Sequence, residues 1–276
     1  KPTSFTPVLA FIGVVLYVFV KNSKKKDIGV VLLGFAVLMF GMDAMSGAVE
    51  GLRDNAAFTS ILTMFSNNPV MGILVGTAFT AIIQSSSATT VMVVSFVNAG
   101  LLTLVQAIGV IMGANIGTTI TAWMVAFLGL TEDISILAIA LMLFGFLFSN
   151  SQKDQRKNIG ELIVGFCLLF LGLSFMKESV PDLRQTPEVL EFVSTWSSHG
   201  FGSVLLFLLF GTILTLVLQS SSATMAITLI MLSMGWIPFG MACAMVLGEN
   251  IGTTITANIA ASIGNTQAKR AAMSHT

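Results

Sequence analysis

A ten-residue stretch, GANIGTTITA at residues 113–122, returns almost unchanged as GENIGTTITA at residues 248–257. The two copies differ at one position, where Ala114 in the first corresponds to Glu249 in the second. Both copies place an asparagine between two glycines and follow it with threonines. Such a polar duplication indicates that the chain consists of two related halves.

A second motif supports this division. QSSSAT occupies residues 84–89 and returns at residues 219–224, so both motifs recur after the same interval along the chain. A repeat of this length is too long for a solenoid. It is typical of the internal symmetry found in transporters.

The composition predicts a membrane protein. Hydrophobic residues make up 55% of the 276 residues, charged residues only 9%, and the mean hydropathy is +0.91. A soluble domain carries about 25% charged residues. The apolar tracts approach the roughly 20 residues that a membrane helix needs. We therefore expect an all-α, polytopic protein of the cell membrane, with the lipid bilayer as its environment. The net charge of zero favours no nucleic-acid partner.

A re-entrant hairpin is predicted around each QSSSAT motif. The apolar tracts on either side of the first copy, at 70–83 and 88–98, are both short. At about 1.5 Å per residue, neither tract spans a hydrocarbon core of about 30 Å. The polar residues between them would form the tip, which must be covered by protein or line a water-filled cavity. The expected hairpins are residues 69–99 and 202–234.

A broken helix is predicted at each GxNIGTT motif, within residues 101–130 and 237–263. Gly113 and Gly117 bracket Asn115 near the middle of an apolar stretch. On their own, two glycines at this spacing favour close helix packing. The asparagine between them is the argument for a break.

The predicted repeats are residues 1–131 and residues 132–265, followed by a polar C-terminal tail at 266–276. Each repeat would contain two spanning helices, the hairpin and the broken helix. The chain then crosses the membrane an odd number of times per repeat, which inverts the second repeat relative to the first. Lysine and arginine counts of six and seven on the two sides leave the orientation undecided.

Inversion would bring the two hairpin tips and the two helix breaks together near the membrane midplane. Serine hydroxyls and helix N-termini, with no opposing cation, are typical of an oxyanion site. A serine run alone more often packs helices together, but two identical copies at fixed spacing argue for a site. The candidate oxyanion ligands are Ser85, Ser86, Ser87, Ser220, Ser221, Ser222, Thr118, Thr119, Thr253 and Thr254.

The same motifs offer oxygen ligands for a cation. The amide side chains are supplemented by Glu249, the one carboxylate in either motif, and an ionisable residue at membrane depth indicates function. The candidate cation ligands are Gln84, Asn115, Gln219, Asn250 and Glu249.

These paired motifs resemble those of the type II sodium-dependent inorganic phosphate cotransporters, particularly the bacterial members. The resemblance extends from about residue 28 to residue 265. It implies a sodium–phosphate symporter that takes up phosphate, with sodium as coupling ion, no other cofactor or metal, no catalytic residue and no enzyme activity. It also implies a homodimer. Carried over, the oxyanion ligands above would bind phosphate and the cation ligands would bind sodium.

Three alternatives stay open. The substrate could be another oxyanion, such as sulfate or arsenate, or the direction could be export. The protein could also be a non-transporting membrane scaffold. The chain starts without methionine and ends before the soluble regulatory domain of many bacterial relatives, so a truncated, rearranged or designed chain is a further interpretation.

Overall fold

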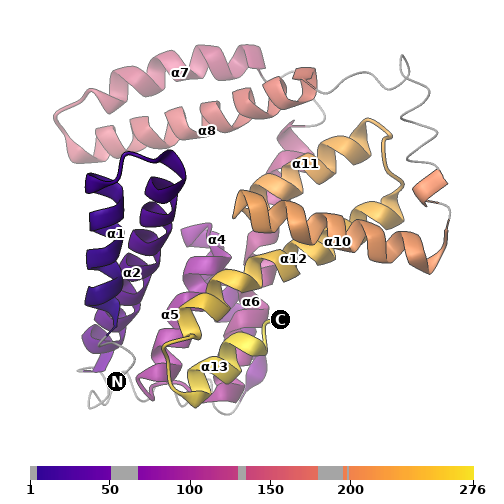
Figure 1. The fold of residues 1–276 in the computed structure, drawn as a ribbon. Helices are drawn as coiled ribbons and strands as arrows, with labels where there is room; N and C mark the ends of the chain where they lie inside the picture. Colours follow the sequence, from indigo (N-terminus) through magenta and orange to yellow (C-terminus); the bar gives the residue numbers. More distant parts are fainter. Residues whose placement is uncertain (1–4, 51–67, 130–134, 180–194, 198) are drawn as a thin grey trace. The chain divides into compact units, whose positions relative to one another are not determined.

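The computed structural model describes residues 5–50, 68–129, 135–179, 195–197 and 199–276, and within these segments the chain forms helices and no strands (Figure 1). The prediction of an all-α protein is confirmed. The predicted boundary between the repeats, at residue 131, lies outside the described residues.

The helices follow the expected order along the chain. The elements are α1 (Thr6–Phe19), α2 (Ser23–Glu50), α4 (Pro69–Ile83), α5 (Ser86–Asn98), α6 (Leu104–Met124), the π-helix η2 (Val125–Gly129), α7 (Ser135–Ser149), α8 (Asp154–Ser179), α10 (Phe201–Leu218), α11 (Ser221–Ser233), α12 (Phe239–Ala261) and α13 (Thr266–Met273). In both halves two helices pack as a pair, α1 with α2 and α7 with α8. Two shorter helices joined at a QSSSAT motif and a longer motif helix come next.

The chain forms two compact units. One contains Lys1–Thr118 with Thr253–Thr276, and the other contains Thr119–Gly252. Both boundaries fall inside a GTT sequence, so α6 and α12 each pass from one unit into the other. The units therefore differ from the predicted sequence repeats, whose inversion stays a prediction.

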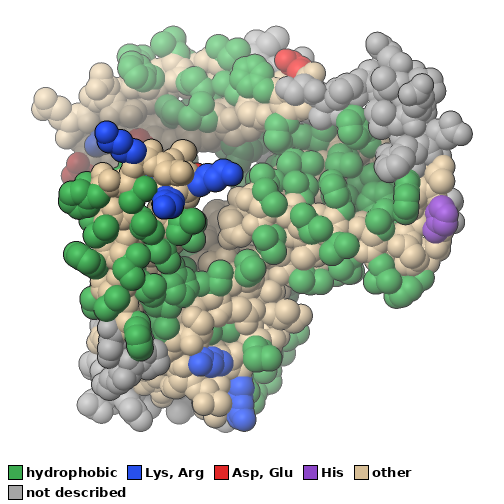
Figure 2. Space-filling model, viewed as in Figure 1, with side chains coloured by type: hydrophobic (Ala, Val, Ile, Leu, Met, Phe, Trp, Pro, Cys, Tyr) green, Lys and Arg blue, Asp and Glu red, His purple; other side chains and the backbone are tan. Residues whose placement is uncertain are grey.

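Three helices in the described part of the chain are long and apolar enough to cross a membrane, namely Leu104–Phe127, Asp154–Met176 and Phe201–Leu218. The last is α10, which the sequence analysis expected to be an arm of a re-entrant hairpin. Helices α4, α5 and α11 are shorter, as predicted. Exposed apolar side chains cover α10 and α1, as Figure 2 shows on the visible face. Such surfaces suit a lipid environment.

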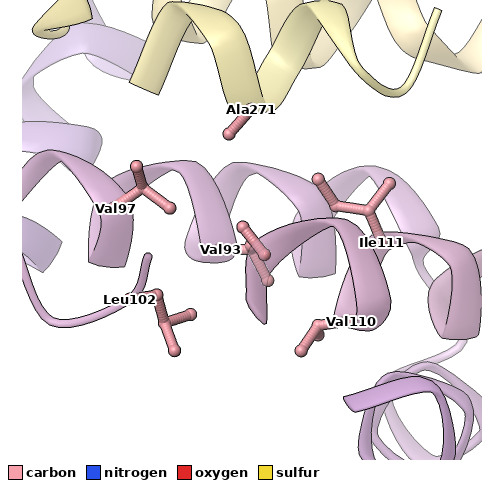
Figure 3. Close-up of a cluster of buried hydrophobic side chains, with 7 residues drawn as sticks. Val93, Val97, Leu102, Val110, Ile111 and Ala271 are labelled. Carbon is pink, nitrogen blue, oxygen red and sulfur yellow. The ribbon is translucent and has the colours of Figure 1, made fainter. Parts of the chain in front are cut away.

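The core of the first unit joins α5, α6 and α13. Val93 and Val97 of α5 lie with Val110 and Ile111 of α6, and Ala271 of α13 closes the cluster (Figure 3). Helix α13 occupies the segment expected to be a polar tail. It is polar on one side only, because Ala268, Ala271 and Ala272 are buried.

The core of the second unit lies between α8 and α11. Cys167, Phe170 and Leu173 of α8 are buried with Ala226 and Ile230 of α11. Apolar side chains at i, i+3 and i+6 on α8 share one face of the helix, which explains the contact. Cys167 acts as a small hydrophobic residue here, and no disulfide joins it to Cys243.

The predicted helix breaks are not found. Helices α6 and α12 continue through both GxNIGTT motifs. Gly113 instead lies against the backbone carbonyl of Ile73, and Gly117 against that of Thr77, so a Cβ at either glycine would collide with α4. The glycines thus serve close helix packing, which was the alternative reading of their spacing. An asparagine in this position does not interrupt the helical hydrogen bonds.

Candidate functional site: two QSSS tips and two motif helices

The tips of the two hairpins have the same backbone geometry. Gln84 after α4 has φ 58° and ψ 28°, and Gln219 after α10 has φ 55° and ψ 26°. Both lie in the left-handed region, which residues other than glycine rarely adopt. The next residue, Ser85 or Ser220, is extended and starts the following helix. Each motif therefore turns the chain within two residues, as a helical hairpin requires.

The glutamine side chains fold back onto the helix that they end. Gln84 Nε2 donates to the carbonyl of Ala81, and Gln219 Nε2 donates to that of Leu216, each over 2.6 Å. The last carbonyls of a helix have no partner within it and carry partial negative charge. Because the amide nitrogen is engaged there, the side-chain oxygen is the atom of each glutamine suited to a cation.

The first serine of each motif caps the next helix. Ser85 Oγ accepts a hydrogen bond from the N–H of Ala88, and Ser220 Oγ accepts one from Ala223, both at 3.2 Å. Serine is among the preferred residues at this position because its oxygen satisfies a backbone donor that the helix cannot. The serine run thus has a local structural role beside any role in ligand binding.

Backbone N–H groups at the tips are available for an anion. The helical hydrogen bonds begin with the N–H of Thr89 donating to Ser85 and that of Thr224 donating to Ser220, both at 3.1 Å. The first two N–H groups of each helix precede this bond and have no partner within the helix. They belong to Ser86, Ser87, Ser221 and Ser222. Together with the helix dipole, these groups favour an oxyanion at each tip.

The hairpins differ in one internal hydrogen bond. In the first, Thr80 Oγ1 donates to Thr89 Oγ1 over 2.8 Å, and Thr89 donates in turn to the carbonyl of Ser85. In the second, Thr224 makes the corresponding bond to its serine carbonyl. The hydroxyl of Thr215, which corresponds to Thr80, is buried and has no hydrogen-bond partner among the described residues.

Glycines set the hairpin against the motif helix in the second half as in the first. Gly248 lies against the carbonyl of Leu208, and Gly252 against that of Thr212. These contacts are the counterparts of those that Gly113 and Gly117 make in the first half. Each unit therefore holds one QSSS hairpin packed on one GxNIGTT helix.

The unbroken helices change what the GTT sequences can donate. The motif pattern predicted a helix N-terminus there, but backbone N–H groups inside a continuous helix are already bonded. Thr118 Oγ1 also donates back to the carbonyl of Ala114 at 3.1 Å. Thr119 is exposed, whereas Thr253 and Thr254 are buried. Any contribution of these threonines to phosphate binding comes from their hydroxyls alone.

Glu249 is buried in the second unit. Its carboxyl oxygen Oε1 lies 2.7 Å from the hydroxyl of Thr228 on α11. Only 1% of Glu249 is exposed, and Thr228 is fully buried. This contact joins the motif helix to the second arm of its hairpin.

Asn115 has a partner that the motifs do not predict. Nε2 of His275, just beyond α13, lies 3.1 Å from Asn115 Oδ1. The next residue, Thr276, accepts a hydrogen bond through its hydroxyl oxygen from the side-chain amide of Asn258 in α12, at 2.9 Å. The motif pattern contains no signal for His275, because the contact joins residues from distant parts of the sequence.

The predicted residues are divided between the units. Residues 84–87, Asn115 and Thr118 lie in the first unit with Thr253 and Thr254. Residues 219–222, Glu249 and Asn250 lie in the second unit with Thr119. Each unit thus assembles one serine tip and one motif asparagine. The meeting of the two sets at a common site stays a prediction.

A pocket of about 370 Å³ opens beside the second tip. Its polar lining comes from Ser222 of the QSSS motif and from Thr121 of α6, a residue that the sequence analysis did not select. The rest of the wall is apolar and comes largely from α8. Its other lining residues are Val125, Leu168, Leu169, Gly172, Leu173, Met176, Ala223 and Ala226.

Comparison with known families accounts for both motif pairs. The family described as Na+/Pi-cotransporter matches residues 1–47, 49–178 and 191–274. The chain belongs to the Na+/Pi-cotransporter family. This is a family of transporters, which is not a class of enzymes. The resemblance inferred from the motifs is confirmed.

Several relatives carry informative names. Uncharacterized protein YqeW of Bacillus subtilis is 34% identical over 254 residues, which cover 89% of this chain and 78% of the relative. Putative inorganic phosphate export protein YjbB of Escherichia coli is 29% identical, over 88% of this chain but only 43% of the relative. Human sodium-dependent phosphate transport protein 2B is 42% identical over 100 residues, or 35% of this chain and 14% of the relative. None of the solved structures matches the chain.

Proposed function

We propose that the protein is a secondary active transporter of the cell membrane that couples sodium to the uptake of inorganic phosphate. The observation that carries this proposal is the pair of QSSS tips. Each has the same left-handed glutamine and serine cap, and each is packed on its own GxNIGTT helix. Membership of the Na+/Pi-cotransporter family supports the choice of phosphate and sodium.

Phosphate would bind at the serine tips. Each tip supplies two backbone N–H groups that precede the helical hydrogen bonds, three serine hydroxyls and the positive end of a helix dipole. In this proposal Ser85, Ser86 and Ser87 bind one side of the anion and their counterparts Ser220, Ser221 and Ser222 bind the other. Threonine hydroxyls of the two GTT sequences would add donors.

Sodium would bind to the oxygen atoms of the same motifs. Carbonyl and carboxylate oxygens are hard ligands that suit a small cation. The side-chain oxygens of Gln84 and Asn115 would form one site, and those of Gln219, Asn250 and Glu249 another. Because only the second set contains a carboxylate, the two sites need not have equal affinity.

A second candidate is export. YjbB, whose name describes phosphate export, matches 88% of this chain. In a coupled transporter the gradients of both ions decide the direction of net flux, so the same site serves either direction. Backbone N–H groups and hydroxyls do not distinguish phosphate from sulfate, and selectivity is therefore tested by competition.

The test is transport of labelled phosphate in proteoliposomes containing the purified protein. An inward sodium gradient should drive phosphate accumulation, and replacement of sodium by potassium should abolish it. Inhibition by excess unlabelled sulfate would show that the site accepts either oxyanion, and unchanged accumulation would show that it selects phosphate. Accumulation that ignores sodium would disprove the coupling, and efflux against an inward sodium gradient would favour export.

The double variant Ser86→Ala with Ser221→Ala tests the site. It removes one hydroxyl from each tip but keeps Ser85 and Ser220, which cap the helices. We expect loss of transport in a protein that is still folded, as judged by its thermal unfolding in detergent. Unchanged transport would place phosphate elsewhere. Thr77→Ser is a matched control, because its hydroxyl bonds to the carbonyl of Ile73 within α4 at 2.8 Å and serine keeps that bond. Homodimer formation is a further proposal, tested by the mass of the detergent-solubilised protein.

A further inference from the structure

The pocket beside the second tip has one polar end and an apolar wall. Its volume is about 370 Å³, and all of its lining residues belong to the second unit. The polar end is formed by Ser222 and Thr121, and the remaining lining residues are apolar. Pockets of this size bind small molecules, and their few polar groups fix how the ligand lies. The pocket is therefore suited to a ligand with a polar head and a small apolar substituent.

The apolar wall combines buried and exposed side chains. Val125 and Leu173 are each 3% exposed, whereas Leu168 is 57% exposed. These residues come from η2 and α8, and α11 supplies the wall next to Ser222. An apolar substituent that enters the pocket meets buried side chains that are already packed, so little further ordering is needed to bind it.

Gly172 leaves room in the wall that α8 forms. No atom of the described residues lies within 4 Å of the position that a Cβ would take at this glycine. Gly145 and Gly160 differ from it, because a Cβ at either would collide with the other helix of the α7–α8 pair. Close helix packing thus accounts for those two glycines but not for Gly172. A glycine inside a helix is less stable than an alanine, so what Gly172 contributes is the open space of the pocket.

The polar end of the pocket adjoins the proposed phosphate site. Ser222 supplies one of the two backbone N–H groups at the start of α11 that have no partner within the helix. Inorganic phosphate bound there leaves the apolar pocket unfilled, because none of its oxygens gains by facing an apolar wall. An alkyl group in place of one oxygen leaves three oxygens for the N–H and hydroxyl donors. It also gives the pocket an apolar occupant.

We propose that the second serine tip also binds phosphorus oxyanions with one small alkyl substituent, namely alkylphosphonates or alkyl phosphate monoesters, and that the alkyl group occupies the pocket lined by α8 and α11. The inference rests on the proposed function for its anion site and extends the class of ligand that this site accepts. Ser222 and Thr121 lie where the head group meets the alkyl group. The apolar wall then decides the preference for an organic over an inorganic phosphate.

Competition with labelled phosphate in proteoliposomes tests the pocket. Methyl-, ethyl-, propyl- and butylphosphonate should inhibit phosphate transport with increasing strength, by about fourfold for each methylene group that enters the pocket. Methyl to butyl phosphate form a second series, and the series with the lower half-inhibiting concentrations identifies the preferred class. Inhibition that is absent, or equal at every chain length in both series, would overturn the proposal and leave the pocket to bilayer lipid.

Two variants of α8 and one control locate the effect. Gly172→Leu fills the pocket and should remove the dependence on chain length, while methylphosphonate still inhibits. Gly165→Leu is the matched control, because a Cβ there also meets open space but Gly165 does not line the pocket. Leu168→Ala, at an exposed position where a substitution disturbs folding little, should weaken inhibition by butylphosphonate and not by methylphosphonate. A dependence on chain length that survives in Gly172→Leu would overturn the proposal.

A binding measurement separates this proposal from the proposed function. Isothermal titration calorimetry of the purified protein in lipid nanodiscs gives the affinities for methylphosphonate and butylphosphonate without any transport. If butylphosphonate binds more tightly, Gly172→Leu removes the difference, and the protein moves no phosphate, the proposed function fails and the pocket stands. Sodium-driven phosphate transport by a protein with equal affinity for the two phosphonates gives the opposite result.

Discussion

The hydroxyl of Thr80 donates to that of Thr89 over 2.8 Å, across the two helices of the first hairpin. Both residues are fully buried. The corresponding hydroxyl in the second hairpin, that of Thr215, is equally buried but has no partner among the described residues. The two hairpins have the same backbone geometry at their tips, but the buried threonine hydroxyl has a hydrogen-bond partner only in the first.

This difference predicts opposite effects of the same substitution. Thr80→Val removes a buried hydrogen bond and should lower the free energy of unfolding by about 1 kcal/mol. Thr215→Val replaces an unsatisfied buried hydroxyl with a methyl group of similar size. It should raise the free energy of unfolding by about 1 kcal/mol. Denaturation in mixed detergent micelles measures both. Equal destabilisation by the two variants would show that Thr215 has a partner in solution.

Close packing at Gly248 predicts a strong effect of one added methyl group. Gly248→Ala would place a Cβ against the backbone carbonyl of Leu208. Because the contact is with the backbone of a packed helix, relieving it requires the two helices to move apart. We expect a loss of about 1–3 kcal/mol of stability. Gly240→Ala on the same helix is the control, because nothing lies within 4 Å of a Cβ there. It should be neutral or stabilising by up to about 1 kcal/mol. A similar loss in both variants would mean that α12 does not pack on α10 in this way.

The sequence predicted two helices joined at each QSSSAT motif, because apolar tracts on either side of a polar motif leave few alternatives. Their re-entry into the membrane stays a prediction, and α10 is long and apolar enough to cross it. The prediction of a helix break at Asn115 was wrong. The glycine spacing was compatible with close helix packing as well as with a break, and the helix is continuous. Gly113 and Gly117 serve packing, and only the position of α4 reveals this. The contact of His275 could not be predicted from the sequence, for a different reason. Its contact with Asn115 depends on how α13 docks, which no local pattern encodes.

The left-handed conformation of Gln84 allows its role in the turn to be tested separately from its proposed role as a sodium ligand. Gln84→Gly keeps φ near 58° without strain but removes the amide. If the side-chain oxygen ligates sodium, the sodium concentration for half-maximal transport should rise about tenfold, which corresponds to about 1.4 kcal/mol of lost binding. Gln84→Val, whose branched side chain opposes a positive φ, should instead lower the melting temperature. An unchanged sodium dependence in a folded Gln84→Gly protein would remove Gln84 from the sodium site.

The buried imidazole of His275 predicts a loss of stability in mild acid. Burial lowers the pKa of His275 below its usual value. Between that lowered pKa and the unfolded value of about 6.5, the unfolded chain binds more protons than the folded one. Stability is therefore complete above about pH 6.5 and falls as the pH drops below it.

His275→Gln can still donate to Asn115 but does not titrate, so its melting temperature should fall less over this range. His199→Gln, at an exposed position, is the control and should keep the decline seen in the unsubstituted protein. If His275→Gln declined as steeply as the control, another group would be responsible for the acid sensitivity.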